Sequence, residues 1–198
     1  MTFLKKIKLL SFLVLPQVLI LSCSVSDSSQ KNTNEGTFET NYALASAVMN
    51  NDQAGVDDAI KSGASVDYIY NDYTMLMLAI EYDVYDDIIL KLIRNKADIG
   101  KRNMRGYNAL MMSVVTNDIG RFKLLMIMSH DILDLQNVEG ETALHLACQL
   151  GDNGAEFVSI LLSRGVDYKI RDRLNNSAYD YIISEETRKL FNERGIYN

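Results

Sequence analysis

One short pattern recurs along the chain every 34 residues, and this interval constrains the fold more than any other feature. Its copies begin with Asp72, Gly106 and Gly140, and each continues with a polar residue and a compact apolar block. Within each copy the apolar side chains recur at helical spacing, as on one face of a helix. A unit of this length cannot bury its apolar face alone, so we expect neighbouring units to stack around one continuous core.

The most complete copy begins at Asn137, continues through Gly140-Glu-Thr-Ala-Leu-His-Leu-Ala-Cys148 and ends at Gly165-Val-Asp167. This stretch resembles the ankyrin repeat, including its Thr-x-Leu-His helix start and its Leu-Leu-x-x-Gly-x-Asp ending. It departs from the family at Ala143, where proline is usual, and by two extra residues around positions 153–155. The resemblance implies an all-α ankyrin-repeat solenoid of about five helix–turn–helix units with hairpin-like connecting loops.

The resemblance extends over residues 38–198, which we predict to form one ankyrin-repeat domain. Its expected units are about 38–69, 70–102, 103–136, 137–172 and 173–198, of which the first and last are degenerate and act as caps. Side chains suited to cap the first helix of a unit stand at Thr74, Asn108, Thr142 and Ser177. Gly63 and Gly165 follow apolar helix ends, where a positive φ is expected.

The first 22 residues have the pattern of a signal peptide. Lys5, Lys6 and Lys8 precede an apolar run of 13 residues, Leu9–Leu21, which is too short to cross a bilayer as a helix. The ending Ile20-Leu-Ser-Cys23 resembles the relaxed lipobox of spirochaete-type lipoproteins. This likeness implies that Cys23 becomes the acylated first residue of the mature chain, for instance carrying palmitate. An ordinary cleaved signal and an uncleaved anchor are the alternatives.

Residues 23–37 have almost no apolar content after the cysteine, so we predict a flexible tether between the lipid and the folded part. The lipoprotein resemblance places the protein on the cell envelope of a bacterium with two membranes. Ser24 stands where an aspartate would signal retention at the inner membrane, which favours the outer membrane. Exposure to the periplasm or to the cell surface remains open at this point.

The composition argues against several kinds of chemistry. A net charge of −6 disfavours nucleic acid as the main partner. Two cysteines and two histidines are too few for a disulfide framework or a four-ligand zinc site. His145 as a general base and Cys148 as a redox thiol are weaker interpretations than structural roles, and His130 reads as a surface residue. We therefore expect no enzyme activity, no cofactor and no bound metal.

Methionine pairs suggest a rival function in small-ligand or soft-metal binding. Most of these residues, however, fall at positions that the ankyrin pattern packs into the core, where methionine is an adaptable filler. The four that do so are Met75, Met77, Met111 and Met126.

Ankyrin proteins commonly bind through their loop tips and the exposed side of the first helices. The corresponding positions here are rich in residue types that are enriched at protein interfaces, although they are alternatively only solvated surface. The predicted protein-binding residues are Tyr70, Tyr73, Tyr82, Met104, Arg105, Tyr107, Glu139 and Glu141. The sequence thus predicts a membrane-anchored, non-catalytic protein-interaction module whose partner is an envelope enzyme or a host protein. An accessory role for an envelope oxidative-stress enzyme is a further alternative.

Overall fold

A computed structural model describes residues 36–128 and 131–196 of the chain. The chain divides into two units, and all of the described residues belong to the second, Thr33–Asn198. The expected signal peptide, Cys23 and most of the expected tether lie outside the described residues, and so does His130. No helix in the described part is long and apolar enough to cross a membrane.

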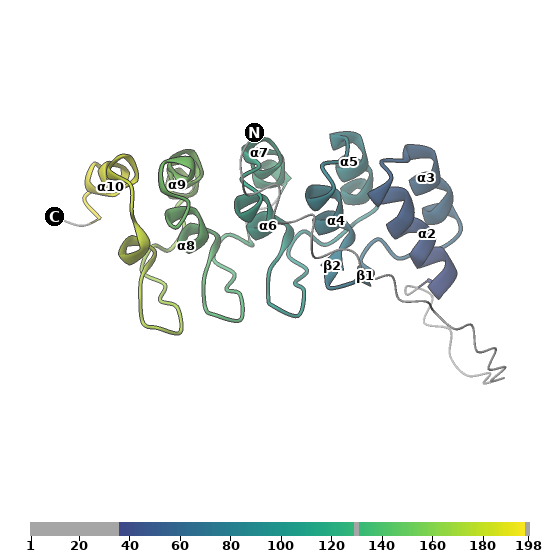
Figure 1. Cartoon of the computed structure of the whole chain (residues 1–198), viewed down its shortest axis with the longest axis horizontal. Helices are drawn as coiled ribbons and strands as arrows, with labels where there is room; N and C mark the ends of the chain where they lie inside the picture. The colour runs from purple at the N-terminus through teal and green to yellow at the C-terminus, as the bar shows by residue number, and fades with distance from the viewer. Residues whose placement is uncertain (1–35, 129–130, 197–198) are drawn as a thin grey trace, which may run out of the picture. The chain divides into compact units, whose positions relative to one another are not determined.

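The described unit consists of antiparallel helix pairs in chain order (Figure 1). The inner helix and outer helix of each pair are α2 (Phe38–Met49) with α3 (Gln53–Lys61), α4 (Met75–Glu81) with α5 (Asp86–Arg94), α6 (Ala109–Val115) with α7 (Ile119–Met128), and α8 (Ala143–Cys148) with α9 (Ala155–Ser163). A short 3-10 helix, η2 (Ala178–Tyr181), and α10 (Glu185–Asn192) complete the array. The all-α prediction is confirmed.

Hairpin-like loops join one pair to the next and project beyond the inner helices (Figure 1). We call them fingers: the first is residues 66–74, the second 99–108, the third 133–142 and the fourth 168–177. The first finger contains the short antiparallel strands β1 (Ile69–Tyr70) and β2 (Tyr73–Thr74). Its two-residue turn, Asn71-Asp72, has positive φ at both positions, which asparagine and aspartate tolerate better than most residues.

The predicted helix caps are all present. The Thr74 hydroxyl accepts a hydrogen bond from the Met77 N–H (3.2 Å), and the Asn108 side chain accepts one from the Met111 N–H (2.9 Å). Thr142 and Ser177 form reciprocal capping boxes with the residues three positions further on. These bonds satisfy backbone donors that a helix start leaves unpaired, which fixes where each inner helix begins.

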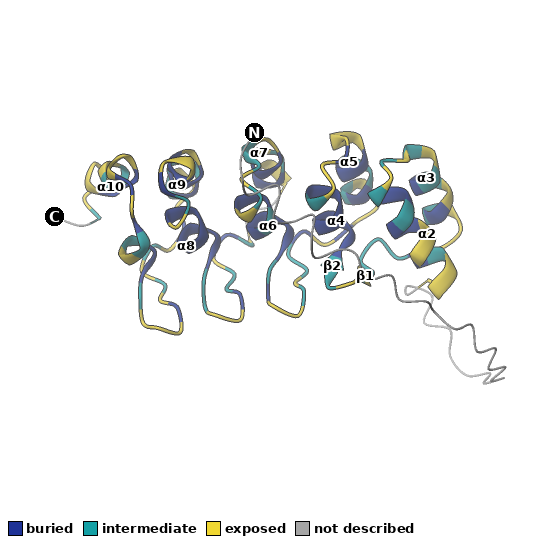
Figure 2. Ribbon diagram, in the orientation of Figure 1, coloured by how far each residue is buried: buried dark blue, intermediate teal, exposed yellow. Residues whose placement is uncertain are grey.

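The core runs between the two rows of helices as a continuous layer of buried side chains (Figure 2). Phe122 of α7 and Phe157 of α9 meet there edge to face, with ring centroids 4.9 Å apart. The small residues Ala79, Ser113 and Ala147 are fully buried on successive inner helices. Packing between neighbouring pairs therefore stabilises the array, as expected for stacked repeats.

Two local features differ from the regular repeat. Helix α2 has 12 residues, more than the other inner helices, and it begins at Phe38 because Thr37 caps it through a reciprocal bond with Thr40. The two extra residues near 153–155 form the 3-10 helix η1 (Gly151–Gly154) before α9. Gly154 is required there, since an added Cβ would lie 1.9 Å from the Ala147 carbonyl oxygen.

Polar contacts join the turns between inner and outer helices of neighbouring repeats. Arg121 of α7 is almost buried, and its guanidinium donates to the Asp83 carboxylate (2.8 Å), to Asp118 and to the Val84 carbonyl. Between the first and second repeats, the Asn51 side chain accepts a hydrogen bond from the Tyr85 N–H (2.9 Å). These bonds fix the register between successive outer helices.

Candidate functional site

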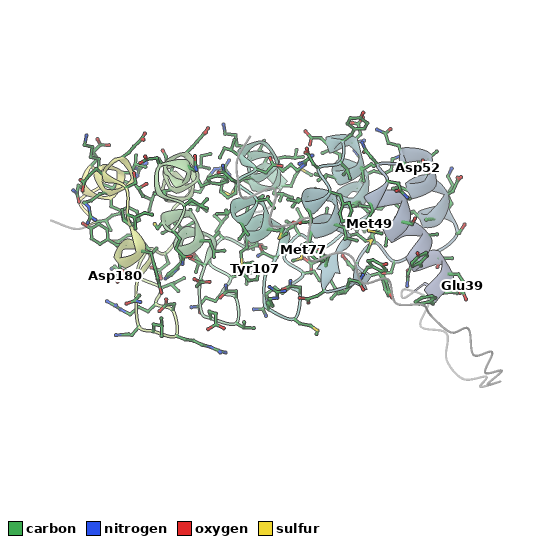
Figure 3. The ribbon with its side chains drawn as sticks, in the orientation of Figure 1. Glu39, Met49, Asp52, Met77, Tyr107 and Asp180 are labelled. Atoms are coloured by element: carbon green, nitrogen blue, oxygen red, sulfur yellow. The ribbon has the colours of Figure 1, made fainter. Side chains whose placement is uncertain are left out.

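The tyrosines predicted to bind a protein lie on the side of the array that carries the fingers. Tyr70 and Tyr73 are directly opposite each other in the β1–β2 register. Tyr82, at the end of α4, lies close enough to Tyr73 to contribute to the raised pKa of Tyr73. Tyr107 lies at the base of the second finger, next to the start of α6 (Figure 3). We call Tyr70, Tyr73, Tyr82 and Tyr107 the tyrosine face; Tyr82 is 42% exposed, and the others are half-buried against the core.

Two further aromatic side chains extend the tyrosine face toward the N-terminal helix. Tyr42 of α2 contacts Tyr70 edge to face, with ring centroids 5.9 Å apart, and Phe38 stacks on Tyr42 at 6.2 Å. Phe38 is 70% exposed and Tyr42 is 48% exposed. Neither residue was predicted as part of the binding surface, although their spacing of four positions within a helix was a usable signal.

Arg105 lies between Tyr73 and Tyr107, the two central residues of the tyrosine face. Its Nε is 3.7 Å from an Asp72 carboxylate oxygen, and its charge acts on both Tyr73 and Tyr107. The same Asp72 carboxylate accepts a hydrogen bond from the Met104 N–H (2.7 Å). Asp72 therefore ties the tip of the second finger to the first finger.

Both central tyrosines keep their protons at neutral pH. Burial raises the pKa of Tyr73 above its ordinary value, and the Glu81 carboxylate raises it further. Burial likewise raises the pKa of Tyr107, with Glu141 adding to the effect. Each hydroxyl is thus a neutral donor and acceptor on an apolar ring, a combination suited to protein interfaces.

The predicted residues Glu139 and Glu141 lie on the third finger, with different surroundings. Glu139 is exposed near the tip. Glu141 is half-buried, and its carboxylate accepts hydrogen bonds from the side-chain amides of Asn137 (2.8 Å) and Gln149 (2.7 Å). Glu141 thus helps to hold the third finger against α8 and also faces Tyr107.

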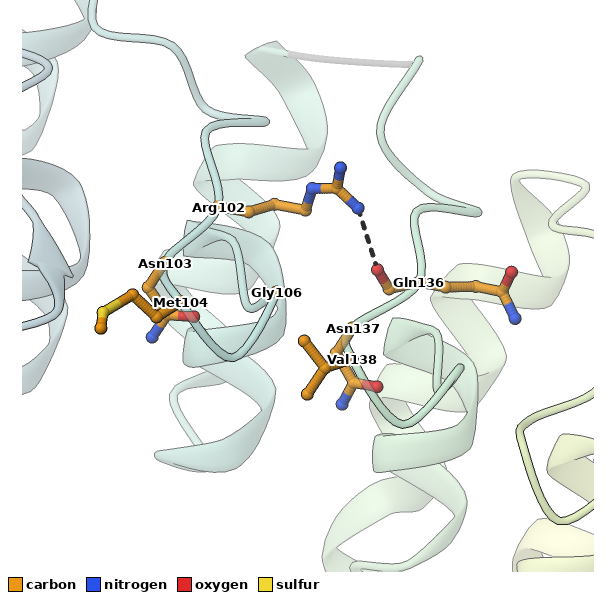
Figure 4. Close-up of a pocket in the computed structure, with 7 residues that line it drawn as sticks. All are labelled: Arg102, Asn103, Met104, Gly106, Gln136, Asn137 and Val138. Carbon is orange, nitrogen blue, oxygen red and sulfur yellow. Dashed lines mark hydrogen bonds between the residues drawn. The ribbon is translucent and has the colours of Figure 1, made fainter.

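An open groove of about 480 Å³ separates the second and third fingers (Figure 4). Arg102 bridges it by donating to the Gln136 carbonyl oxygen at 3.2 Å, and the exposed side chains of Met104 and Val138 flank it. The groove is shallow and open to solvent, so it offers a surface for contact rather than an enclosed ligand pocket.

His145 has a structural environment. Its Nδ1 accepts a hydrogen bond from the Thr142 N–H (3.2 Å), so Nε2 carries the proton and faces the Asn176 carbonyl oxygen (3.3 Å). The ring is 1% exposed, and burial lowers the pKa of His145 below its ordinary value. With both nitrogens engaged, the ring links α8 to the fourth finger.

His145 is expected to make the stability of the array depend on pH. In the unfolded chain this residue becomes protonated below about pH 6.5, whereas in the folded state its lowered pKa keeps it neutral to a more acidic pH. Its contribution to the free energy of unfolding is therefore fully present above pH 6.5 and is lost as the pH falls from there toward the folded-state pKa. The free energy of unfolding, measured by chemical denaturation, should therefore fall more between about pH 7 and pH 5 in the wild type than in His145→Gln. His130→Gln is the matched control, and equal losses in the wild type and His145→Gln would contradict this role.

The sulfur-bearing candidates lie in the core. Cys148 is fully buried, and burial raises the pKa of its thiol to about 12, so the thiolate is scarce at neutral pH. Met75, Met77, Met111 and Met126 are at most 1% exposed, as their packing positions predicted. Among the described residues, no group of three or more His, Cys, Asp or Glu side chains is placed to hold a metal ion.

A family model for ankyrin repeats, in three copies, matches residues 76–172. Residues 76–172 are ankyrin repeats. The matched residues run from α4 to the fourth finger, and Tyr82, Met104, Arg105, Tyr107, Glu139 and Glu141 lie within them. No curated protein matches the chain significantly.

Ankyrin repeats indicate a protein–protein interaction module and are generally non-catalytic. In this ankyrin array the tyrosine face lies on helices and fingers that neighbouring repeats hold in place. The predicted residues form two groups along it. Tyr70, Tyr73, Tyr82 and Tyr107 form the face itself, whereas Met104, Arg105, Glu139 and Glu141 are the other predicted residues of the second and third fingers.

Proposed function

We propose that this ankyrin array is a lipid-anchored protein of the bacterial envelope that binds a partner protein through the tyrosine face. The observation that supports binding there is the run of exposed and half-buried aromatic rings from Phe38 to Tyr107 on successive repeats. Tyrosine buries a large area with few rotatable bonds and keeps a polar hydroxyl, which explains its enrichment at interface hot spots.

Rigidity of the tyrosine face favours binding. Finger and helix positions are fixed by the Asp72 contacts, the Thr74 cap and the Glu141 bonds, so little conformational freedom is lost when a partner docks.

Site-specific photocrosslinking in cells tests the location of this interface. A photoreactive aromatic residue at Tyr107 is expected to give a discrete crosslinked product, because the partner covers this position. The matched control is the same residue at Ile127, which is 67% exposed on the outer helix α7. Equal crosslinking from both positions, or a product from Ile127 alone, would contradict the proposal.

The membrane anchor rests on the first 23 residues, with their basic start, short apolar run and terminal Cys23. Several acyl chains on Cys23 would hold the protein durably, where a single chain binds only marginally. We place the protein at the outer membrane, with protease digestion of intact cells separating surface from periplasmic exposure.

Mass spectrometry of the detergent-extracted protein tests the anchor. We expect an N-terminal peptide that begins at Cys23 and carries acyl groups, and we expect Cys23→Ser to lack them. An unmodified mature N-terminus would favour an ordinary cleaved signal instead. A peptide beginning at Met1 would indicate an uncleaved anchor.

A further inference from the structure

The tips of the second, third and fourth fingers each expose an apolar side chain. Met104 is 79% exposed, Val138 is 38% exposed and Leu174 is 77% exposed. The three fingers project beyond the inner helices in the same direction (Figures 1 and 2). Single exposed apolar residues are common on proteins, but here one lies at the tip of each of three adjacent loops. Met104 and Val138 occupy equivalent positions, and Leu174 lies one residue further along its finger, after Arg173.

Backbone hydrogen bonds fix these three tips in one row. The Val138 N–H donates to the Arg105 carbonyl oxygen (2.9 Å), and the Arg173 N–H donates to the Glu139 carbonyl oxygen (2.9 Å). Within each finger, an Asn or Asp side chain closes the turn by accepting two N–H groups at 2.9–3.1 Å; these residues are Asn103, Asn137 and Asp172. The row is therefore presented as a unit rather than as independent loops.

Positive charge is concentrated beside two of the three tips. Six of the 16 Lys and Arg residues in the described part of the chain lie on the second and fourth fingers, namely Lys101, Arg102, Arg105, Lys169, Arg171 and Arg173. Five of them are exposed, and Lys101 is half-buried.

The carboxylates near these tips compensate this charge only in part. Asp172 is only 9% exposed, and its carboxylate is engaged by the Leu174 N–H, the Asn176 N–H and the Tyr181 hydroxyl. The third finger carries the exposed carboxylates of Asp134 and Glu139 and the half-buried one of Glu141, and Asp72 of the first finger lies 3.7 Å from Arg105. The second and fourth fingers therefore have a basic character within an acidic protein, and the third finger between them is acidic.

We propose that the finger tips dock on an anionic lipid surface, with Met104, Val138 and Leu174 entering the headgroup region and the six cations facing lipid phosphates. The combination of separate apolar tips and surrounding Lys and Arg side chains fits a soft, anionic interface. A folded acidic protein would instead be expected to meet a continuous patch or a pocket, and the groove between these fingers is shallow and open.

This inference concerns a surface other than the tyrosine face and does not depend on the protein-binding proposal. It assigns Met104 and Arg105, which the sequence analysis placed on the protein-binding surface, to contact with lipid. If Cys23 is also acylated, the two membrane contacts would together restrict how the array stands on the bilayer.

A tryptophan placed at a finger tip tests the proposal in the full chain, which has no tryptophan of its own. Met104→Trp is mixed with vesicles of phosphatidylcholine, with or without phosphatidylglycerol. We expect a blue shift of its emission, and quenching by brominated lipid, with the phosphatidylglycerol vesicles. The matched control is Ile127→Trp on α7, at a site that is similarly exposed, and its emission should not shift.

The apolar N-terminal run can bring the full chain to any vesicle, so binding of the chain alone is not a sufficient test. The emission of a tryptophan at the finger tip is measured instead, because it reports whether that tip enters the lipid. In the Met104→Trp background, adding Arg171→Gln and Arg173→Gln should weaken binding to phosphatidylglycerol vesicles about tenfold or more. Adding Lys61→Gln and Arg94→Gln, on the outer helices, should leave it unchanged. The proposal is overturned if the tip emission does not shift, if it shifts equally without phosphatidylglycerol, or if Ile127→Trp shifts as much.

Discussion

Phe122→Ala is expected to lower the free energy of unfolding by about 3–5 kcal/mol, the usual loss for a fully buried phenylalanine. Phe122 has no exposed surface, and its ring meets Phe157 of the next outer helix edge to face. The substitution removes apolar contact and also leaves a cavity between the third and fourth repeats. Urea unfolding followed by circular dichroism measures the loss.

Phe38→Ala is the control for this substitution, because the Phe38 ring is 70% exposed at the start of α2. Its effect should stay well below that of Phe122→Ala. Since stability in stacked repeats comes from contacts between neighbours, the Phe122 variant is also expected to unfold in two steps rather than one. A loss below about 1 kcal/mol would mean that the core does not continue between α7 and α9.

Gly106→Ala is expected to cost about 2–4 kcal/mol, from backbone strain together with a steric clash. Gly106 has φ +77°, and an added Cβ would lie 2.8 Å from both Asn137 Cα and Val138 N. These are backbone atoms of the next finger, which a side-chain rotation cannot relieve. The melting temperature and the urea midpoint should both fall.

Gly63→Ala separates the two causes. Gly63 has φ +92°, but an added Cβ there has no atom within 4 Å, so only the strain of a positive φ remains. We expect a loss of about 1 kcal/mol, clearly smaller than for Gly106→Ala. Equal losses in the two variants would show that the second and third fingers are not packed as closely as described.

The clash with the next finger also explains why the second and third fingers have glycine at this position and the fourth has asparagine. The positions equivalent to Gly106 are Gly140 in the third finger and Asn175 in the fourth, and all three have positive φ. An added Cβ at Gly140 would lie 2.9 Å from the Arg173 N of the fourth finger. In the described part of the chain no further finger packs against the fourth, so its turn needs only a residue that tolerates positive φ.

Local sequence patterns were enough to predict most of the fold. The caps at Thr74 and Asn108 and the positive φ at Gly63 and Gly165 are confirmed, because each depends on neighbours within a few residues. Helix α2 begins at residue 38, where the first unit was predicted to begin, but its cap was not predicted because Thr37 was assigned to the tether. Lys96 also adopts a positive φ at a helix end where glycine would be expected.

The candidate surfaces were only partly predictable. Repeat spacing placed Tyr73 and Tyr107 on the same side of successive repeats, since their positions are fixed by the helix starts that follow them. The edge-to-face contact of Tyr42 with Tyr70, the bridge from Asp72 to Met104 and the row of finger tips depend on contacts between different repeats. Such contacts follow from how closely the repeats stack, which no single repeat's sequence specifies.

The most direct test of the central claim uses the partner protein that crosslinks to position 107. Its affinity is measured for the wild-type array and for the variant with both Tyr73→Ala and Tyr107→Ala. Interface hot spots contribute about 2 kcal/mol or more, so we predict that the affinity falls at least about tenfold. Because both rings are half-buried, some loss of stability is expected, and circular dichroism must show that the variant stays folded. Tyr85→Ala, at the start of the outer helix α5, should bind as the wild type does. Unchanged affinity in a folded double variant would contradict the claim that the tyrosine face is the binding surface.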